Sequence, residues 1–520
     1  MTNNDIVQKL WNLCDVLRDD GINYSDYVTE LVLLLFIKME RENTEQGLLS
    51  KHKLPDGCRW NDLKDKSGLN LLNDYKLILL NLSKSTDSLI AAIYTDAQTR
   101  LREPRHLEQL IRTLDGIDWF SAKRDGLGDL YEGLLEKNAS ETKSGAGQYF
   151  TPRVLIESIV RCVQPQAGEV IQDPAAGTAG FLIAADAYIK SITDDLYDLK
   201  ASEQDFQKSK AFIGVELVPN TRRLALMNCL LHGMEGDDEG VVHLGNSLGQ
   251  VGAGLNKVDV ILANPPFGTA KGGDASITRD DLTYKTSNKQ LAFLQHIYRG
   301  LKAGGRAAVV LPDNVLFEAG VGTDVRRDLM NKCNLHTILR LPTGIFYAAG
   351  VKTNVLFFTK GTLDNPKKEE NCTENVWVYD LRTNMPSFGK RTPFGAQHLE
   401  PFERAYGTDA KGASPRTEGE WSFSVDGKQT PENNRWRMHS REWIRDKKGD
   451  SLDISWLKDN DSVDAANLPE PELLAAEAMN ELTEALRELD GLMAALGKSD
   501  EAKVQKDLLA AVLGLDVVNA

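Results

Sequence analysis

The sequence predicts an α/β protein with a central parallel sheet joined by crossover helices. Residues from about 145 to 360 alternate between short β-branched runs and helical stretches, the pattern of such a sheet. The first ~140 residues show helical periodicity without clear strands, and a regular apolar repeat near the C-terminus predicts another helix. The sheet is therefore expected between two helical regions.

These changes of pattern divide the chain into four segments. We expect a helical N-terminal domain over 1–140, the sheet domain over 141–365, a mixed extension over 366–465 and a helical arm over 466–520. The mixed extension is rich in charge, proline and glycine, and we expect its tryptophans mainly to pack small peripheral cores. They are Trp377, Trp421, Trp436, Trp443 and Trp456.

Within the sheet domain, six apolar runs predict strands and the stretches between them predict helices. The strands are expected at 169–173, 211–216, 258–264, 306–313, 335–341 and 352–360. Such a sheet binds its ligands beyond the carboxyl ends of the strands, near the point where the strand order reverses. Functional side chains are therefore expected just after strand ends.

The C-terminal segment carries a heptad pattern. After Pro469 and Pro471, apolar residues recur at alternating four- and three-residue steps, as in a short coiled coil that serves subunit assembly. The residues are Ala475, Met479, Leu482, Leu486, Leu489, Met493 and Leu496.

Composition limits the class of protein. The six cysteines show no CxxC spacing, so neither a disulfide framework nor a metal cluster is predicted. No apolar run approaches the roughly 18 residues that span a bilayer, and a reduced, cytoplasmic protein without a membrane role is expected. The net charge of −15 is unusual for a chain that binds nucleic acid alone, because phosphate contacts need basic residues.

A glycine-containing turn, DPAAGTAG, follows the first predicted strand. Gly177 and Gly180 allow a tight turn that can approach a ligand closely. Ala175 stands where a dinucleotide fingerprint requires glycine, which disfavours pyrophosphate binding. Asp173, at the strand end, suits a cationic group such as the amino group or sulfonium of S-adenosylmethionine.

Two further segments can complete a cofactor site. Glu216 ends the second predicted strand, where an acidic side chain can accept hydrogen bonds from ribose hydroxyls. In GAGQYFTPR, residues 145–153, glycines precede Tyr149 and Phe150, and Thr151-Pro152 can start a helix, so the segment can wrap the far end of a ligand. Alone, these features would be read as a solvated glutamate and a helix cap.

The fourth motif is Asn264-Pro265-Pro266-Phe267, which directly follows the apolar run VDVILA. The amino group of a base is a poor nucleophile because its lone pair is delocalised into the ring. The side-chain oxygen of Asn264 and the carbonyl of Pro265 can accept its two hydrogens, while Phe267 stacks on the base. A base inside a duplex must be flipped out to reach such a pocket.

The four motifs together favour an amino-methyltransferase, although NPPF alone would be read as a turn. Cytosine-C5 methylation is excluded because no cysteine follows a proline. Asn264 fits an adenine-N6, cytosine-N4 or protein glutamine acceptor. A protein or RNA methyltransferase and a non-catalytic nucleotide-binding scaffold are the alternatives.

Five segments, GAGQYFTPR, DPAAGTAGFL, FIGVEL, NPPFG and KTNVLFFTKG, resemble the modification subunits of type I restriction-modification systems of the enterobacterial K-type group. The resemblance extends over nearly the whole chain and implies a Rossmann-like, S-adenosylmethionine-dependent DNA adenine-N6 methyltransferase. It implies that Asn264 to Phe267 hold the adenine. The cofactor residues that it implies are Gln148, Tyr149, Phe150, Thr151, Pro152, Arg153, Thr178, Ala179, Gly180 and Glu216.

The resemblance also implies partners. Double-stranded DNA would be the substrate, a separate specificity subunit would join two modification subunits and choose the site, and a restriction motor subunit would complete the complex. An acidic chain is reasonable if another subunit supplies much of the phosphate contact. Near the predicted pocket, the charges of Lys271, Arg279, Lys285 and Lys289 are nearly cancelled by aspartates.

Overall fold

The computed structural model describes residues 3–22, 26–45, 52–117, 119, 127–141, 151–267, 277–346, 351–389, 392–422 and 434–457. All of them belong to one compact unit, Met1–Leu457. The predicted C-terminal arm and its heptads lie outside the described residues. No helix in the described ranges is both long enough and apolar enough to span a bilayer.

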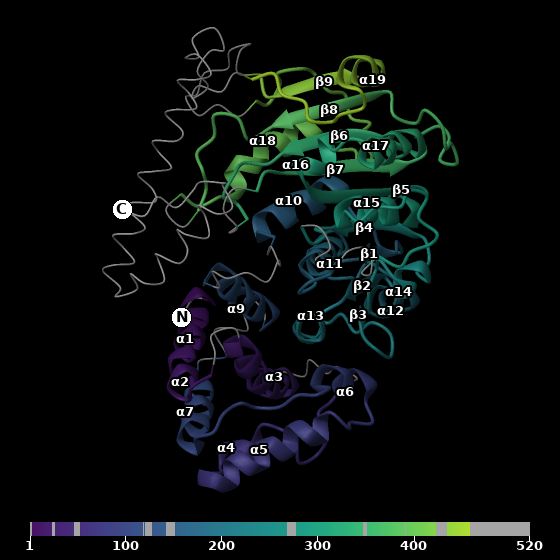
Figure 1. Cartoon of the computed structure of the whole chain (residues 1–520). Helices are drawn as coiled ribbons and strands as arrows, with labels where there is room; N and C mark the ends of the chain where they lie inside the picture. The colour runs from purple at the N-terminus through teal and green to yellow at the C-terminus, as the bar shows by residue number, and fades with distance from the viewer. Residues whose placement is uncertain are drawn as a thin grey trace, which may run out of the picture. The chain divides into compact units, whose positions relative to one another are not determined.

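The N-terminal region is helical, as predicted (Figure 1). Its helices are α1 (Asn3–Asn12), α2 (Cys14–Asp19), α3 (Tyr27–Glu45), α4 (Asn61–Lys64), α5 (Gly68–Leu82), α6 (Ser88–Tyr94), α7 (Pro104–Asp115) and α9 (Leu127–Glu141).

The strands are β1 (Ile171–Asp173), β2 (Phe212–Glu216), β3 (Val242–Leu244), β4 (Val258–Ala263), β5 (Leu301–Pro312), β6 (Cys333–Arg340), β7 (Thr353–Lys360), β8 (Asn375–Asp380) and β9 (Trp436–Ser440). The helices before, between and after them are α10 (Arg153–Val163), α11 (Gly180–Ile192), α12 (Ala201–Ser209), α13 (Pro219–Leu231), α14 (Gln250–Ala253), α15 (Lys289–Gly300), α16 (Asp313–Phe317), α17 (Val321–Lys332), α18 (Ala396–Tyr406) and α19 (Arg441–Lys448). All six predicted strands are present.

The strands form one sheet in the order β3-β2-β1-β4-β5-β7-β6-β8-β9. The strands from β3 to β5 are parallel, but β7 runs antiparallel to both β5 and β6, and β9 runs antiparallel to β8. The prediction of a parallel sheet is therefore wrong for β7. β6 and β7 are consecutive strands joined by residues 341–352, and they pair side by side in opposite directions, as antiparallel neighbours can.

Three strands were not predicted. β3 is three residues long and only its first residue, Val242, is buried, so it lacks the fully buried pattern of β1. β8 and β9 lie in the segment expected to be a peripheral extension, but they extend the sheet next to β6. Trp436 is fully buried and stacks on Trp377 with ring centroids 5.0 Å apart, so these two tryptophans belong to the main core.

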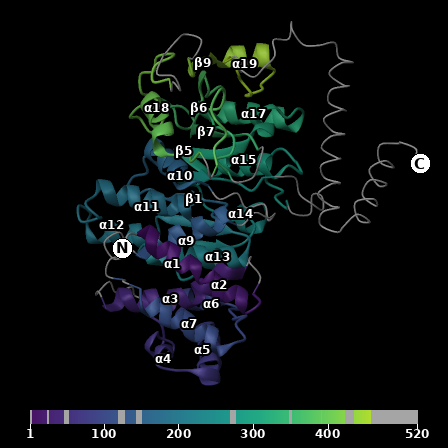
Figure 2. The same cartoon turned by 90° about the vertical axis from the view of Figure 1, so that its left-hand side faces the viewer.

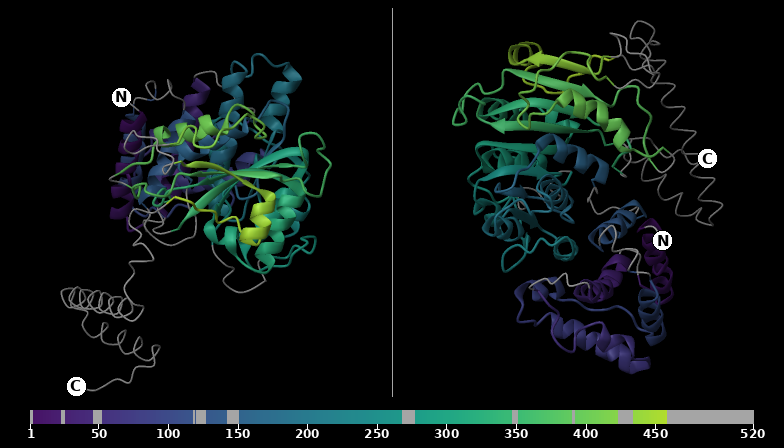
Figure 3. Two further views of the ribbon diagram at one scale, coloured as in Figure 1. Left: turned by 90° about the horizontal axis from the view of Figure 1, so that it is seen from above. Right: turned by 180° about the vertical axis from the view of Figure 1, so that it is seen from behind.

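Helices pack on both faces of the sheet (Figures 1 and 2). One apolar core joins α10, α11, α13 and α18 to side chains such as Leu262 and Val310, while the other joins α15, α16, α17 and α19 to Ile261 and Val309. Consecutive residues of β4 and β5 thus face opposite layers, as the two-residue period of a strand requires. Figure 3 shows how the strands rotate relative to one another along the sheet.

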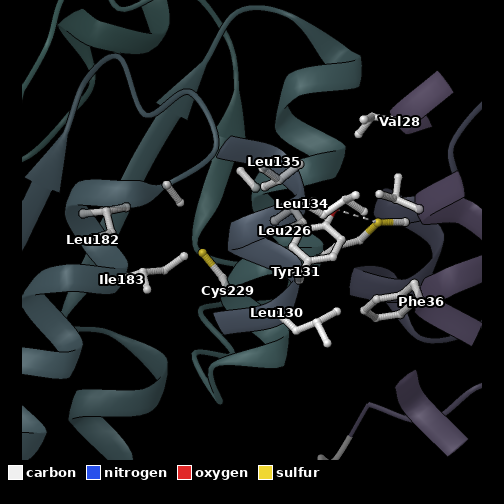
Figure 4. Close-up of a cluster of buried hydrophobic side chains, with 14 of the residues drawn as sticks. Val28, Phe36, Leu130, Tyr131, Leu134, Leu135, Leu182, Ile183, Leu226 and Cys229 are labelled. Atoms are coloured by element: carbon white, nitrogen blue, oxygen red, sulfur yellow. Dashed lines mark hydrogen bonds between the residues drawn. The ribbon is translucent and has the colours of Figure 1, made fainter. Parts of the chain in front are cut away.

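Helix α9 packs between the N-terminal helices and the sheet domain. Figure 4 shows its residues Leu130, Tyr131 and Leu134 beside Phe36 of α3 and Leu226 of α13. The Tyr131 hydroxyl contacts the Met227 sulfur at 3.5 Å.

Candidate active site

The site begins at the carboxyl end of β1. Asp173 is only 2% exposed, and its Oδ1 accepts a hydrogen bond of 2.9 Å from the backbone N–H of Ala175. Burial raises the pKa of Asp173 to about 7, with a further contribution from the charge of Glu216, although the Ala175 bond opposes the shift. A buried carboxyl group of this kind is stabilised in its charged form by a cation.

The turn after β1 has the geometry that its glycines predicted. Gly177 has φ +55°, and Ala179 adopts a left-handed conformation with φ +69° before α11 begins at Gly180. A Cβ atom at Gly180 would lie 3.0 Å from the Ile156 side chain, so glycine lets α11 pack closely on α10.

Two buried side chains hold this turn from outside it. The Asn228 amide of α13 donates to the Thr178 carbonyl at 3.0 Å, and the Ser247 hydroxyl donates to the Pro174 carbonyl at 2.6 Å. Neither residue was predicted from the sequence. Asn228 lies in the apolar run LALMNCLL of α13 and could have been noticed as a buried polar residue, whereas Ser247 gives no local signal.

Glu216 ends β2 and faces the same turn. Its Oε2 accepts from the Gly177 backbone N–H at 3.0 Å and its Oε1 from the Val218 N–H at 2.8 Å. Burial raises the pKa of Glu216, and these backbone bonds partly offset the shift. The bonds fix the carboxylate, and each oxygen has a second lone pair for a ligand hydroxyl.

Asn264 directly follows β4, the strand next to β1 in the sheet. The strand order reverses between these two strands, which is where sheets of this kind bind ligands. The Asn264 amide nitrogen donates to the Thr151 hydroxyl at 2.8 Å. The side-chain oxygen is then the atom of this amide that can accept a hydrogen from a substrate.

The rest of the motif is held from α15 and from the loop before β7. The Gln290 amide donates to the Pro266 carbonyl at 2.8 Å. The half-buried Phe267 ring packs edge-on against Phe346, with centroids 6.1 Å apart. Gln290 is a buried residue that the sequence did not single out, because nothing near it in the chain marks the contact.

Arg153 points to carboxylates of α9 and α10. Its guanidinium lies 2.9 Å from Asp129, 3.4 Å from Glu132 and 3.0 Å from Glu157. Burial raises the pKa of Glu132 to about 7 despite Arg153. Ligand atoms of Asp129, Glu132 and His232 lie within 4.8 Å of one another, close enough to hold a metal ion, but Arg153 already supplies a positive charge there.

The predicted residues thus fall into three groups. Asp173, Gly177, Thr178, Ala179, Gly180 and Glu216 lie together around the β1–α11 turn, and Asn264 to Phe267 follow the adjacent strand β4. Thr151 contacts Asn264, Pro152 caps α10, and Arg153 is paired with carboxylates. Gln148, Tyr149 and Phe150 lie outside the described residues.

Arg279 is not placed to contact DNA, because its charge is used in contacts within the protein. Its side chain is buried, pairs with Asp281, contacts His296 at 2.8 Å and donates to the Ser247 carbonyl at 3.1 Å. Arg279 therefore anchors its own loop to the loop after β3. Lys271 lies outside the described residues.

The β1–β2 site fits S-adenosylmethionine in its chemistry. The buried Asp173 suits a cationic amino or sulfonium group, and Glu216 offers fixed acceptors for ribose hydroxyls. The nearby turn lacks the glycine that a dinucleotide fingerprint needs at Ala175.

Three family models match the chain. Residues 122–446 match the model of the N-6 DNA methylase family, residues 6–114 that of the HsdM N-terminal domain, and residues 468–511 that of the C-terminal domain of type I restriction enzyme methylase subunits. The fold and these family models thus define the class as an adenine-specific DNA methyltransferase. The chain belongs to the family of type I restriction enzyme methylase subunits.

Individual relatives support the same assignment. The EcoKI methylase subunit of Escherichia coli strain K12 and the StySPI methylase subunit of Salmonella potsdam are each 58% identical to the chain, and each match covers 99% of both sequences. The crystal structure of the EcoKI M protein matches at 54% identity with a TM-score of 0.58, covering 97% of this chain and 99% of that one. A type I restriction-modification structure, described by its complex assembly and conformational transition, matches at 25% identity and TM-score 0.67, covering 96% and 99%.

Proposed function

We propose that the chain binds S-adenosylmethionine at the β1–β2 site and methylates the N6 amino group of an adenine flipped out of duplex DNA. The observation that carries this proposal is the placement of Asp173 and Asn264 at the carboxyl ends of adjacent strands where the strand order reverses. The Asp173 carboxylate, which can bind a cation, and the Asn264 amide, which can bind an amino group, therefore lie at the same edge of the sheet.

The roles of the site residues follow from their chemistry. S-adenosylmethionine supplies a methyl group bound to a cationic sulfur. Asp173 would face the cationic part of the cofactor, and Glu216 would accept from ribose hydroxyls. Gly177 and Thr178 are already fixed by Glu216 and Asn228, so this half of the site needs little rearrangement to bind.

Asn264 and Pro265 would act on the target base. The Asn264 side-chain oxygen and the Pro265 carbonyl would accept the two hydrogens of the amino group and direct its lone pair toward the methyl group. Phe267 would stack on the base. The nitrogen–methyl bond would form as the sulfur–methyl bond breaks, leaving a neutral thioether, and the methylated amino group would then release one proton to solvent. No strong base is needed beforehand, because the leaving sulfur is already positively charged.

The proposal includes partners. A separate specificity subunit would choose the DNA site and join two copies of this chain, and a restriction subunit would complete the complex. The net charge of −15 supports this division, since a chain that read DNA alone would be expected to carry a basic surplus. The segment 466–520 would serve the assembly.

The experiment measures transfer of tritiated methyl from S-adenosylmethionine to unmethylated genomic DNA, with the full chain co-purified with its specificity subunit. Digestion to nucleosides is expected to place the label in N6-methyladenine. A label in N4-methylcytosine would contradict the proposed acceptor. Omission of the specificity subunit is the control, and undiminished transfer by the chain alone would contradict the proposed division of labour.

A further inference from the structure

Thr151 lies in the segment that resembles a cofactor-binding motif, but its side chain contacts the base-binding motif. Thr151 is only 8% exposed, and its hydroxyl accepts a hydrogen bond of 2.8 Å from the Asn264 amide nitrogen. The two residues are 113 positions apart in the chain. The contact is therefore a tertiary one that neither local sequence predicts.

Thr151 is itself held firmly. Pro152 restricts the backbone next to it, and its carbonyl accepts from the backbone N–H of Leu155 at 2.9 Å as α10 begins. One residue further, Arg153 pairs with Asp129 of α9 and Glu157 of α10. The backbone directly after Thr151 is thus fixed by a helix start and by an arginine paired with carboxylates.

The orientation of Asn264 determines what it can accept. An amide has one acceptor atom and one donor group, and only the acceptor can serve a substrate amino group that donates hydrogens. With the nitrogen directed at Thr151, the oxygen is directed away from it. Loss of the hydroxyl would allow the amide to rotate, which lowers the fraction of molecules that present oxygen to the base.

We propose that Thr151 is a positioning residue for Asn264, which sets the amide for the target amino group, and that Arg153 anchors it. This inference rests on the proposed methyltransferase function. It separates Thr151 and Arg153 from the residues that bind the cofactor itself.

The test compares Thr151→Val with Thr151→Ser in the complex with the specificity subunit. Valine keeps the shape but removes the hydroxyl, and loss of one hydrogen bond is expected to lower kcat by about 10-fold. The Kd for S-adenosylmethionine, measured by calorimetry, is expected to stay within about twofold. Serine restores the hydroxyl, so its kcat is expected within about threefold of the unmodified protein.

Thr113→Val is the matched control, because the Thr113 hydroxyl bonds only to the Gln109 carbonyl within α7 among the contacts described. It is expected to leave kcat and Kd unchanged. If Thr151→Val weakened cofactor binding in proportion to its loss of kcat, Thr151 would be a cofactor residue and the inference would be overturned. Unchanged kcat in Thr151→Val would overturn it as well.

Arg153→Gln tests the anchor. It is expected to lower kcat less than Thr151→Val does and to leave the Kd for the cofactor unchanged. Thermal unfolding checks that the variant is folded. A loss of cofactor affinity in Arg153→Gln would overturn the anchoring role. The unmodified complex distinguishes failure of the proposed function from failure of the positioning role. If it formed no N6-methyladenine, the proposed function would be refuted rather than the role of Thr151.

Discussion

The two halves of the candidate site are built in different ways. Around β1 and β2, the groups that hold the turn come from its own strands and the helices next to them: Glu216 bonds Gly177, and Asn228 bonds Thr178. After β4, the Asn264 motif is held by Thr151 before α10 and by Gln290 in α15. The first half is held by β2, α13 and the loop after β3, all on one side of the sheet, whereas the second is held by residues from before α10 and from α15.

This difference suggests that the halves can be damaged separately. A rigid cofactor half should bind S-adenosylmethionine whether or not the base half is intact. The base half should control the rate of transfer without changing cofactor affinity. Each of the following substitutions tests this independence.

The largest effect is expected from Asn264→Ala. Removal of a preorganised group at a reacting centre costs about 100-fold or more in rate, so methyl transfer should become almost undetectable. Cofactor affinity by calorimetry should stay within about twofold, because Asn264 would not touch the cofactor. Phe267→Ala should instead lose base stacking and weaken DNA binding about 10-fold. Loss of cofactor binding in both variants would show that the two halves are not independent.

A smaller effect is expected from Asp173→Asn, on the cofactor side. The buried Asp173 has a pKa of about 7, and a cationic ligand binds its ionised form, so cofactor affinity should rise between pH 6 and pH 8. Asparagine should remove this rise and weaken binding at pH 8 by about 10-fold, the scale of one charged hydrogen bond. Calorimetry over this pH range measures both. A variant with the unmodified pH dependence would assign the titration to another group.

Asp173 also affects stability. Its folded pKa lies above the ordinary value of 3.8, so the stability it contributes is present below that value and lost as pH rises through about 7. Asp173→Asn should therefore unfold at a higher temperature than the unmodified chain at pH 8, with a smaller difference at pH 5. An equal difference at both pH values would contradict the shifted pKa.

The smallest effect on transfer is expected from Gln290→Leu. Loss of the bond to the Pro266 carbonyl should lower kcat by about fivefold and leave cofactor affinity unchanged. Gln8→Leu in the exposed part of α1 is the matched control and should change neither quantity. If Gln290→Leu weakened cofactor binding instead, α15 would support the cofactor half.

Much of this division could be predicted from the sequence. The cofactor half depends on residues just after strand ends, and the turn with Gly177 and the acidic Glu216 both fall at predictable places in an alternating pattern. β3 was missed because only one of its three residues is buried, and β8 and β9 were missed because helix and loop separate them in a polar segment. The contacts of Thr151 and Gln290 with the base motif depend on how distant elements pack, which no local pattern records.

The position of α9 has a consequence for how the protein unfolds. Its side chains share one continuous apolar core with α3, α11 and α13, and Arg223 of α13 donates to the Ile93 carbonyl of α6 at 2.7 Å. The helical region and the sheet domain therefore share one hydrophobic core. Calorimetry of the chain should show them melting in one cooperative transition, and a fragment that begins at α10 should aggregate through the apolar surface of α13 that α9 covers.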